Sequence, residues 1–411
     1  MTGLASRVLR RLVEIGPFRT AIAITILQFS IVVAVGGYAA QQGPREPFAG
    51  DWMVLAQPGH DLVSNGIASL QRWDALWYQH IALDGYAPDN GTTAFMPLYP
   101  TLGRLVAIPL FGNVGLALVL VSSTFYPIAL WLLARLVAQE APSLRIRPDE
   151  TLPVGILTML TLATFPTGFF FVAPFTESPF LALTLASVLM ARRRRFGWAA
   201  VFGALATLVR VQGLFLVFPL AWEALRAAGL TARPAPPTGR PARRALVGLA
   251  CAATPALALG AWYLGLSVAF GRPALGISAQ APWGYHLVPP WEALAASASY
   301  IESMLPHPMG FIESLDMACL LGFAGLLVAA RRLPFSHTLY AIPSLVLVGA
   351  RVMFMLPLMS VSRYILAIYS GFLWLGTWLW RHPRLAVAWL VIGAIAQVVL
   401  VQWFARWGFV A

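Results

Sequence analysis

The sequence predicts an all-α polytopic membrane protein with about 11 transmembrane helices. The chain has 411 residues, of which 59% are hydrophobic and 11% are charged, whereas a soluble domain carries about 25% charge. Apolar runs of roughly 20 residues, the length that crosses a bilayer, recur along the chain. We therefore expect residues 1–411 to form a single integral membrane domain with the lipid bilayer as a partner.

The basic residues predict which helix ends face the cytoplasm. The net charge is +12, and every basic residue is arginine. The arginines gather between apolar runs, at 7–19, 192–195, 226–244, 331–332 and 381–384. Such clusters mark cytoplasmic loops, because positive charge resists translocation. They indicate topology, so no nucleic acid is expected as a partner.

With those clusters inside, the N-terminus is cytoplasmic and the C-terminus lies outside. The first apolar run, 18–40, is longer than the roughly 7–15 residues of a signal-peptide core, so we interpret it as a retained span. Further spans are expected at 113–138, 151–172, 176–191, 245–268, 311–330, 336–352, 363–380 and 385–404, with two short ones within 196–226 that meet near Arg210. The protein is expected to be a multi-pass protein of the inner (plasma) membrane.

Three long connections separate the spans. Residues 41–112 are expected to form an outer loop with amphipathic helices, which is the candidate active-site loop. Residues 227–244, rich in proline, alanine and arginine, predict a flexible cytoplasmic loop. Residues 270–310 form a long outer loop, where acceptor contacts are expected at Trp283, Tyr285, His286, Trp291 and Glu302.

Most carboxylates fall on the outer side, although acidic residues do not determine orientation. This bias indicates that the outer face carries the functional carboxylates. The short cytoplasmic loops contain no phosphate-binding glycine motif, so a lipid-linked substrate is favoured over a cytosolic nucleotide. The two cysteines lie in apolar runs and form no metal-ligand pair.

Residues 68–83 can form one helix with Leu70, Trp73, Trp77 and Ile81 on a single face. Tryptophan favours the membrane–water boundary, so this helix is expected to lie flat on the outer surface. Asp74 and Tyr78 would be neighbours at the edge of that face. A carboxylate there can meet a lipid-borne donor and a polar acceptor, but a merely solvated Asp74 is the alternative.

Other polar residues occur in unusual settings. Tyr99 lies in the proline-bounded stretch 95–100, a rigid turn before a short helix. Glu177 lies between Pro174 and Pro179 at an outer helix end, where it is either functional or a helix N-terminal acid. Arg210 and Arg363 either bind a phosphate or extend so that their charge lies at the membrane–water interface. For Arg351 the sequence does not decide between these two roles.

No metal-ligand spacing occurs, and Asp74, His80 and Asp84 are the sole local cluster. The expectation is no metal and no cofactor.

The ordered motifs resemble the PIG-V-type mannosyltransferases, which comprise the second mannosyltransferase of glycosylphosphatidylinositol assembly and its bacterial relatives. The family pattern appears as Trp73-Asp74 with Trp77-Tyr78, Ile81-Ala82, Gly85-Tyr86, the stretch 95–100, Phe175-Thr176-Glu177-Ser178, Arg210 with Gly213, and Arg363-Tyr364. Two positions depart from it. Met96 replaces a phenylalanine, and Phe175 replaces a tyrosine whose hydroxyl is thereby lost.

The resemblance implies a GT-C-like fold and an inverting transfer of mannose, or a related hexose, from a polyprenyl-phosphate sugar. The acceptor, a glycan, lipid or protein, would be met on the periplasmic or extracellular face. Asp74 would be the catalytic base. Trp73, Trp77, Tyr78, His80, Tyr99, Glu177, Arg210, Arg363 and Tyr364 would bind substrate. The alternative is a transporter or flippase of a lipid-linked sugar, which should show paired broken helices with ionisable groups near the membrane midplane, whereas the carboxylates here are expected at the outer boundary.

Overall fold

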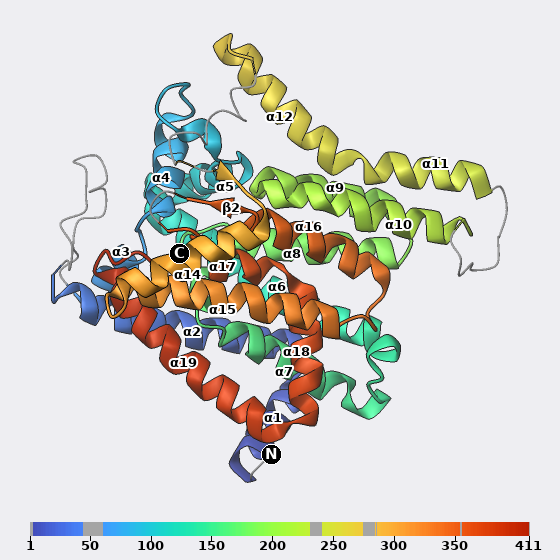
Figure 1. Cartoon of the computed structure of the whole chain (residues 1–411), viewed down its shortest axis with the longest axis horizontal. Helices are drawn as coiled ribbons and strands as arrows, with labels where there is room; N and C mark the ends of the chain where they lie inside the picture. Colours follow the sequence, from blue (N-terminus) through green and yellow to red (C-terminus); the bar gives the residue numbers. More distant parts are fainter. Residues whose placement is uncertain are drawn as a thin grey trace.

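The protein is built almost entirely of helices (Figure 1). The computed structural model describes residues 3–43, 61–230, 241–273, 284, 286–353 and 356–410. Within these ranges a two-stranded antiparallel sheet pairs β1 (His286–Leu287) with β2 (Arg351–Val352). Most of the expected loop 227–244, part of the outer loops, and the acceptor candidates Trp283 and Tyr285 lie outside the described residues.

Four of the described helices are long and apolar enough to cross a membrane. They are α2 (Pro17–Ala40), α6 (Val114–Leu144), α15 (Pro308–Ala329) and α19 (Pro383–Ala405), and each coincides with an expected span. A fifth crossing forms if α11 (Pro241–Ala252) and α12 (Thr254–Phe270), which meet at a bend of 40°, act as one span. The all-α architecture with several apolar spans is confirmed, while the count of eleven stays a prediction.

The remaining expected spans are shorter or interrupted. Helix α7 (Thr151–Ala163) ends before Pro166, which lacks a backbone donor and disfavours helix in the residue before it. A 3-10 turn at Gly168–Phe171 follows. The short helices of this group are α8 (Glu177–Arg192), α9 (Phe196–Val209), α10 (Val217–Ala227), α16 (Phe335–Gly349), α17 (Val361–Tyr364) and α18 (Tyr369–Arg381). The break between α9 and α10 at Arg210 agrees with the sequence.

The first outer segment contains α3 (Leu62–Ser69), α4 (Asp74–Asp84) and α5 (Leu98–Ala107). The expectation of one continuous helix over 68–83 is wrong, because the chain leaves helical conformation between α3 and α4. The reason is tertiary: the backbone of Trp73 has φ 54 and ψ −122, and its ring packs on Trp407 and Phe409 from the far end of the chain.

Helix α4 is covered by protein on one side rather than lying as a free surface helix. Ala75, Leu76 and Ile81 are buried, and the helix packs against α5 and α6. The short helix expected after residue 100 is present as α5, which a 3-10 turn extends to Leu110. Helix α1 (Gly3–Ile15) precedes the first span, and helix α14 (Pro290–Met304) lies within the expected outer loop 270–310.

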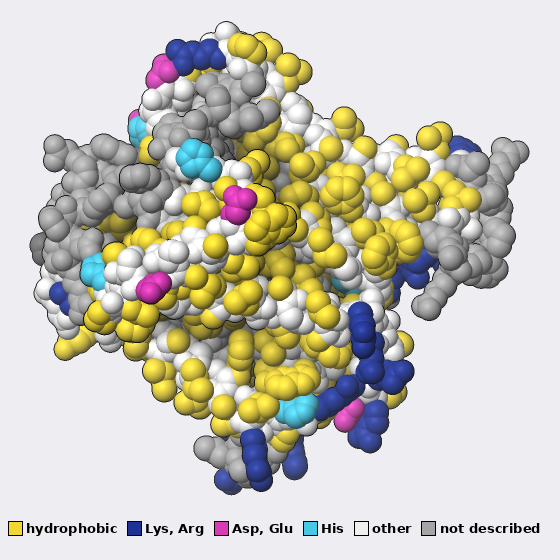
Figure 2. Space-filling model, in the orientation of Figure 1, with side chains coloured by type: hydrophobic (Ala, Val, Ile, Leu, Met, Phe, Trp, Pro, Cys, Tyr) yellow, Lys and Arg dark blue, Asp and Glu magenta, His cyan; other side chains and the backbone are white. Residues whose placement is uncertain are grey.

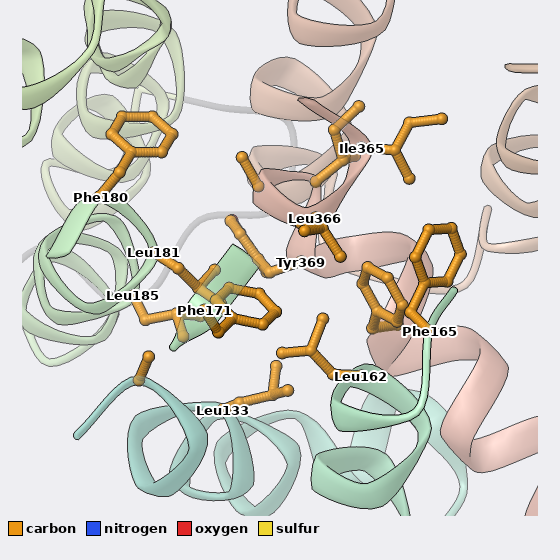
Figure 3. Packing of buried hydrophobic residues seen from close by; sticks show 14 of the residues in the cluster. Leu133, Leu162, Phe165, Phe171, Phe180, Leu181, Leu185, Ile365, Leu366 and Tyr369 are labelled. Carbon is orange, nitrogen blue, oxygen red and sulfur yellow. The ribbon is translucent and has the colours of Figure 1, made fainter. Parts of the chain in front are cut away.

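The hydrophobic core joins segments that are distant in sequence. Figure 3 shows Phe171 and Tyr369 in the same cluster as Leu133, Leu162 and Leu181. All of these side chains are at most 1% exposed. Helices α6, α7, α8 and α18 therefore form one packed unit, and Glu177 of the candidate site is the first residue of α8.

Charge is distributed unevenly over the visible face (Figure 2). Most of the arginine side chains lie along its lower and right edges, whereas carboxylates and histidines lie mainly toward the upper left. Helix α4 lies in the upper-left part, helix α14 and the C-terminus lie left of centre at mid-height, and the N-terminus lies at the lower edge (Figure 1). This is the asymmetry expected if the arginine-rich end is cytoplasmic.

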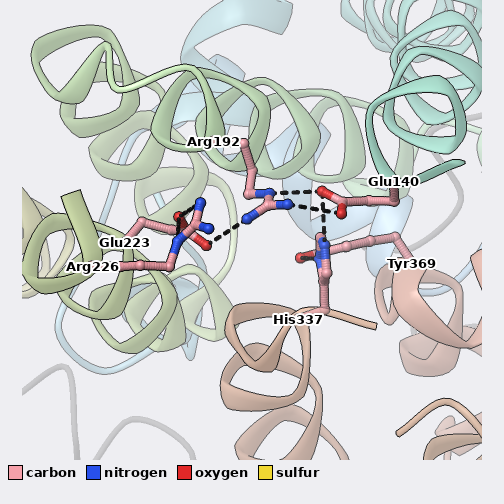
Figure 4. A network of polar contacts seen from close by, with 6 residues as sticks. All are labelled: Glu140, Arg192, Glu223, Arg226, His337 and Tyr369. Atoms are coloured by element: carbon pink, nitrogen blue, oxygen red, sulfur yellow. Dashed lines mark hydrogen bonds and ion pairs between the residues drawn. The ribbon is translucent and has the colours of Figure 1, made fainter. Parts of the chain in front are cut away.

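A network of ion pairs and hydrogen bonds connects the helices at the arginine-rich end (Figure 4). The Arg192 guanidinium donates to both oxygens of Glu140, at 2.7 and 2.9 Å, and to Glu223 at 3.1 Å. His337 lies 3.4 Å from Glu140 and contacts the Tyr369 hydroxyl at 3.0 Å. The network joins α6, α8, α10, α16 and α18, and it lies apart from the cavity described below.

Replacing Glu140 by alanine is expected to destabilise the protein by about 3–5 kcal/mol, because the Arg192 side chain, which is 10% exposed, loses its main partner. Thermal melting of the detergent-purified protein, followed by tryptophan fluorescence, measures this. The matched control is Asp149→Ala, since Asp149 is 68% exposed and an exposed pair contributes about 0–1 kcal/mol. Equal melting temperatures for the two variants would contradict a structural role of the network.

Candidate active site

Most of the predicted site residues lie in or directly behind the wall of one cavity. It has a volume of about 190 Å³. Its walls include Asp74 and Tyr78 of α4, Arg210 at the end of α9, and Arg363 and Tyr364 of α17. Glu177, the first residue of α8, lies directly behind the wall. Six of the ten predicted residues thus converge, although Asp74 and Arg363 are 289 positions apart.

The charged groups form a continuous chain of ion pairs. Arg363 Nη2 donates to Asp74 Oδ2 at 2.8 Å, and Arg363 Nε lies 3.2 Å from Glu177 Oε1. Arg210 Nη1 donates to the same Glu177 oxygen at 2.5 Å. Arg363 therefore bridges two carboxylates, and Glu177 links two arginines.

The two carboxylates differ in accessibility. The Asp74 side chain is 31% exposed, whereas that of Glu177 is 2% exposed. Within the described part of the chain, the Asp74 hydrogen bonds use Oδ2 and leave Oδ1 available to a substrate. Asp74 is therefore the carboxylate that a substrate can reach, while Glu177 pairs with the two arginines inside the protein.

The Tyr364 ring lies among three guanidinium groups. The Cζ atoms of Arg210 and Arg351 are each 4.5 Å from its centroid, and that of Arg363 is 5.3 Å away. Cations favour the face of an aromatic ring, so the ring helps to hold the arginines together. Three arginines against two carboxylates leave one excess positive charge at the cavity.

Tyr78 contributes a neutral hydroxyl to the wall. Burial raises the pKa of this phenol well above its usual range, and the nearby carboxylates of Asp74 and Glu177 raise the pKa further. A phenol in this setting keeps its proton at neutral pH, so Tyr78 is available as a hydrogen-bond donor.

Asp74 is positioned by a strained turn. Trp73, the residue before α4, has a positive φ of 54, which is uncommon for a bulky residue and often marks a functional site. The C-terminal segment holds this turn in place, and we call this contact the C-terminal clamp. The Trp407 ring packs edge-to-face against Trp73, and its centroid lies 4.3 Å from Cζ of Arg72. Phe409 packs on Trp73 and also lines the cavity.

Arg363 is positioned by buried carboxylates of α15. Asp316 accepts from the backbone N–H of Ser362 at 2.7 Å, and Glu313 accepts from that of Leu358 at 2.9 Å. Both acidic side chains are fully buried. They satisfy backbone donors at and before the start of α17, which follows Ser360 at φ 68.

Arg210 owes its position to Gly213. Arg210 is extended, with φ −148 and ψ 142, and a 3-10 turn at Val211–Leu216 follows it. A Cβ at Gly213 would lie 2.4 Å from the backbone nitrogen of Thr207. The turn can fold back onto α9 because residue 213 has no side chain, which explains the arginine–glycine spacing.

No protein-family model matches the chain, and no curated protein sequence matches it. Two solved structures of the oligosaccharyltransferase of Archaeoglobus fulgidus are similar to it. The complex with Zn and sulfate is 14% identical over 93% of this chain, with a TM-score of 0.39. The structure tethered to an acceptor peptide with an NVT sequon is 12% identical over 94%, with a TM-score of 0.40. This chain covers 52% and 55% of those chains, about half their length.

Besides Glu177, which lies directly behind the cavity wall, four predicted residues lie outside the cavity lining. Trp73 supports the turn described above, and Trp77 stacks on Phe95 at 5.6 Å. His80 bonds to Asp84 at 2.9 Å and contacts Asn90. Tyr99 is fully buried, and its hydroxyl bonds to Ser122 and the Leu118 carbonyl. All four side chains contact other parts of the protein in this structure, and their contacts with substrate stay a prediction.

Asp74, His80 and Asp84 do not converge either. Asp74 turns toward Arg363, while His80 and Asp84 pair at the other end of α4. Among the described residues, no group of three or more acidic, histidine or cysteine side chains is arranged to hold a metal.

Several cavity residues were missed by sequence reasoning. They are Gln212, Thr176, Met353, Met359, Ser360 and Phe409. Gln212 and Thr176 adjoin predicted positions, so proximity to Arg210 and Glu177 was an available signal. Phe409 had no such signal, because its place depends on how α19 returns to α4. Arg351, left open by the sequence, belongs to the arginine cluster around Tyr364.

Proposed function

We propose that this chain is an inverting glycosyltransferase that moves mannose, or a related hexose, from a polyprenyl-phosphate sugar to an acceptor hydroxyl. The observation that carries the proposal is the accessible Asp74 carboxylate in one cavity with an arginine cluster of excess charge +1. A sugar phosphodiester carries one negative charge, so this cluster complements it. A diphosphate carries more charge than the cluster neutralises.

The proposed step is one in-line displacement. Asp74 takes the proton of the acceptor hydroxyl, and the acceptor oxygen bonds to the anomeric carbon. The bond from that carbon to the phosphate oxygen breaks, and polyprenyl phosphate leaves with the electron pair. Arginine side chains stabilise the negative charge that develops on the leaving group.

The membrane setting is part of the proposal. The distribution of arginine supports a multi-pass protein in the plasma membrane with the cavity toward the non-cytoplasmic face. A prenyl chain would stay in the bilayer while its phosphate reaches the arginines. The acceptor remains open among a glycan, a lipid and a protein.

The helix breaks at Arg210 and before Glu177 agree with one part of the transporter alternative, which expects paired interrupted helices with ionisable groups near the membrane midplane. The test is purified protein in liposomes supplied with radiolabelled farnesyl-phosphate mannose and a bacterial membrane extract as acceptor source. We expect a labelled glycoside and free farnesyl phosphate, with farnesyl-diphosphate mannose used poorly. Movement of intact donor between leaflets without a new glycoside would favour the transporter.

The C-terminal clamp gives a further expected result. Trp407→Ala removes the ring that packs on Trp73 and Arg72, so the strained turn should relax and displace Asp74. Misplacement by about 1 Å can cost roughly 100-fold in rate, and we expect a loss of kcat of at least about 10-fold. The control is Trp198→Ala, because Trp198 is 60% exposed on α9. A kcat for Trp407→Ala equal to that of the control would remove the clamp from the mechanism.

A further inference from the structure

Gln212 lines the cavity, and its side-chain amide has no protein partner among the described residues. Its side chain is 1% exposed and lines the cavity with Arg210 and Asp74. Neither its Nε2 nor its Oε1 has a hydrogen-bond partner among the described residues. Buried polar groups in proteins are almost always bonded, so an amide left open at a cavity wall needs an explanation.

The other buried glutamines behave differently. Gln28 donates to the Ala163 carbonyl and accepts from the Tyr126 hydroxyl. Gln79 donates to Gln71 at 3.2 Å. Glutamine is thus bonded where it supports the fold of this chain, and Gln212 departs from that pattern at the substrate cavity.

The chemistry of the amide limits what can bind there. Nε2 donates hydrogen bonds and Oε1 accepts them. A phosphodiester offers acceptors alone, so it can satisfy Nε2 but not Oε1. A hydroxyl group can both donate and accept, and adjacent hydroxyls of a hexose can satisfy both ends of the amide together.

The position of Gln212 agrees with a sugar next to a phosphate. It lies two residues after Arg210, in the 3-10 turn at Val211–Leu216. A phosphate held by the arginines would place the attached hexose within the same small cavity. The charged walls attract the phosphate, and the neutral amide is suited to the uncharged ring.

We propose that Gln212 binds hydroxyl groups of the sugar that the donor carries, and so selects the sugar. This inference rests on the proposed function. It concerns the recognised sugar rather than the reacting atoms, so Gln212 is a specificity residue.

The test compares binding of farnesyl-phosphate mannose with that of farnesyl phosphate, by tryptophan fluorescence of the purified protein. The wild type should bind the sugar-bearing probe more tightly. Gln212→Met keeps the length of the side chain and removes both polar atoms. We expect it to reduce the preference for the sugar by roughly 10-fold, with farnesyl phosphate bound as before. Probes that each lack one mannose hydroxyl should identify the group concerned, because the wild type should discriminate against that probe and Gln212→Met should not.

Melting temperature separates a binding role from a structural one. An amide without protein partners contributes little to folding, so Gln212→Met should keep or raise the melting temperature. The matched control is Gln79→Met, at a buried glutamine outside the cavity lining. It should lower the melting temperature and leave the preference for the sugar intact.

The possible contrary results distinguish failure of the proposed function from failure of the inference about Gln212. If the wild type binds neither probe, the proposed function fails together with the inference. If the wild type prefers the sugar-bearing probe and Gln212→Met keeps that preference, the inference alone is overturned. Loss of folded protein in Gln212→Met would show a structural role and would also overturn it.

Discussion

Asp74→Asn is expected to lower kcat by about 10²- to 10⁴-fold, the range that a positioned general base contributes. The amide keeps the shape of the side chain and can still accept the hydrogen bond from Arg363. It cannot take the proton of an acceptor hydroxyl at neutral pH. The KM for the donor should change little, because Arg210, Arg351 and Arg363 are left in place. Initial rates with farnesyl-phosphate mannose at several donor concentrations separate the two parameters.

The control for this experiment lies on the same helix. Asp84 has a side chain 65% exposed and pairs with His80 away from the cavity. Asp84→Asn makes the same change from carboxylate to amide on α4, and we expect it to transfer sugar at the wild-type rate. Near wild-type transfer by Asp74→Asn, with the protein folded, would exclude Asp74 as the base. Equal losses in the two variants would indicate a general charge effect.

The convergence of the site could be predicted from the sequence to a useful extent. Asp74 and Tyr78 are four positions apart on a helical stretch, and both line the cavity. Glu177, Arg210 and Arg363 each stand where a charge is costly inside apolar sequence. Such residues need partners, and the structure shows that they are partners of one another.

The local path of the chain could not be predicted in the same way. The interval between α3 and α4 has helical periodicity, yet Trp73 leaves the helix because Trp407 and Phe409 meet its ring. That contact joins residues more than 330 positions apart, and no local propensity encodes it. His80 and Tyr99 lie outside the cavity lining for a related reason. Each belongs to a suggestive motif, but neighbouring packing uses its polar atoms.

The alternation of arginines and carboxylates along the chain of ion pairs explains how the arginine cluster remains stable when no anion is bound. Glu177 is 2% exposed and pairs with both Arg210 and Arg363. Isolated buried guanidinium groups would be strongly unfavourable, and paired ones are tolerated when the geometry is good. Glu177 therefore compensates part of the positive charge, and the remaining excess is left for a substrate phosphate.

Arg363 joins the two carboxylates in this chain of ion pairs. Arg363→Met is therefore expected to have the largest effect on stability and activity taken together. It removes the bridge between Asp74 and Glu177, which are held at 2.8 and 3.2 Å. Removing one partner of a buried ion pair costs about 3–5 kcal/mol, so the melting temperature should fall. The KM for the donor should rise and kcat should fall, because phosphate binding and the position of Asp74 both change.

Arg363→Lys separates charge from geometry. Lysine keeps the positive charge, but a single ammonium cannot reproduce the planar fork that contacts two carboxylates at once. We expect folded protein that binds farnesyl phosphate, with kcat lowered by about 10-fold or more because Asp74 loses its fixed orientation. The control is Arg384→Lys, since Arg384 is exposed at the start of α19. If Arg363→Lys had wild-type kcat, positive charge alone would suffice and the bridge would have no role in orienting the base. If Arg363→Met kept both its melting temperature and its donor affinity, Arg363 would be excluded as the phosphate ligand.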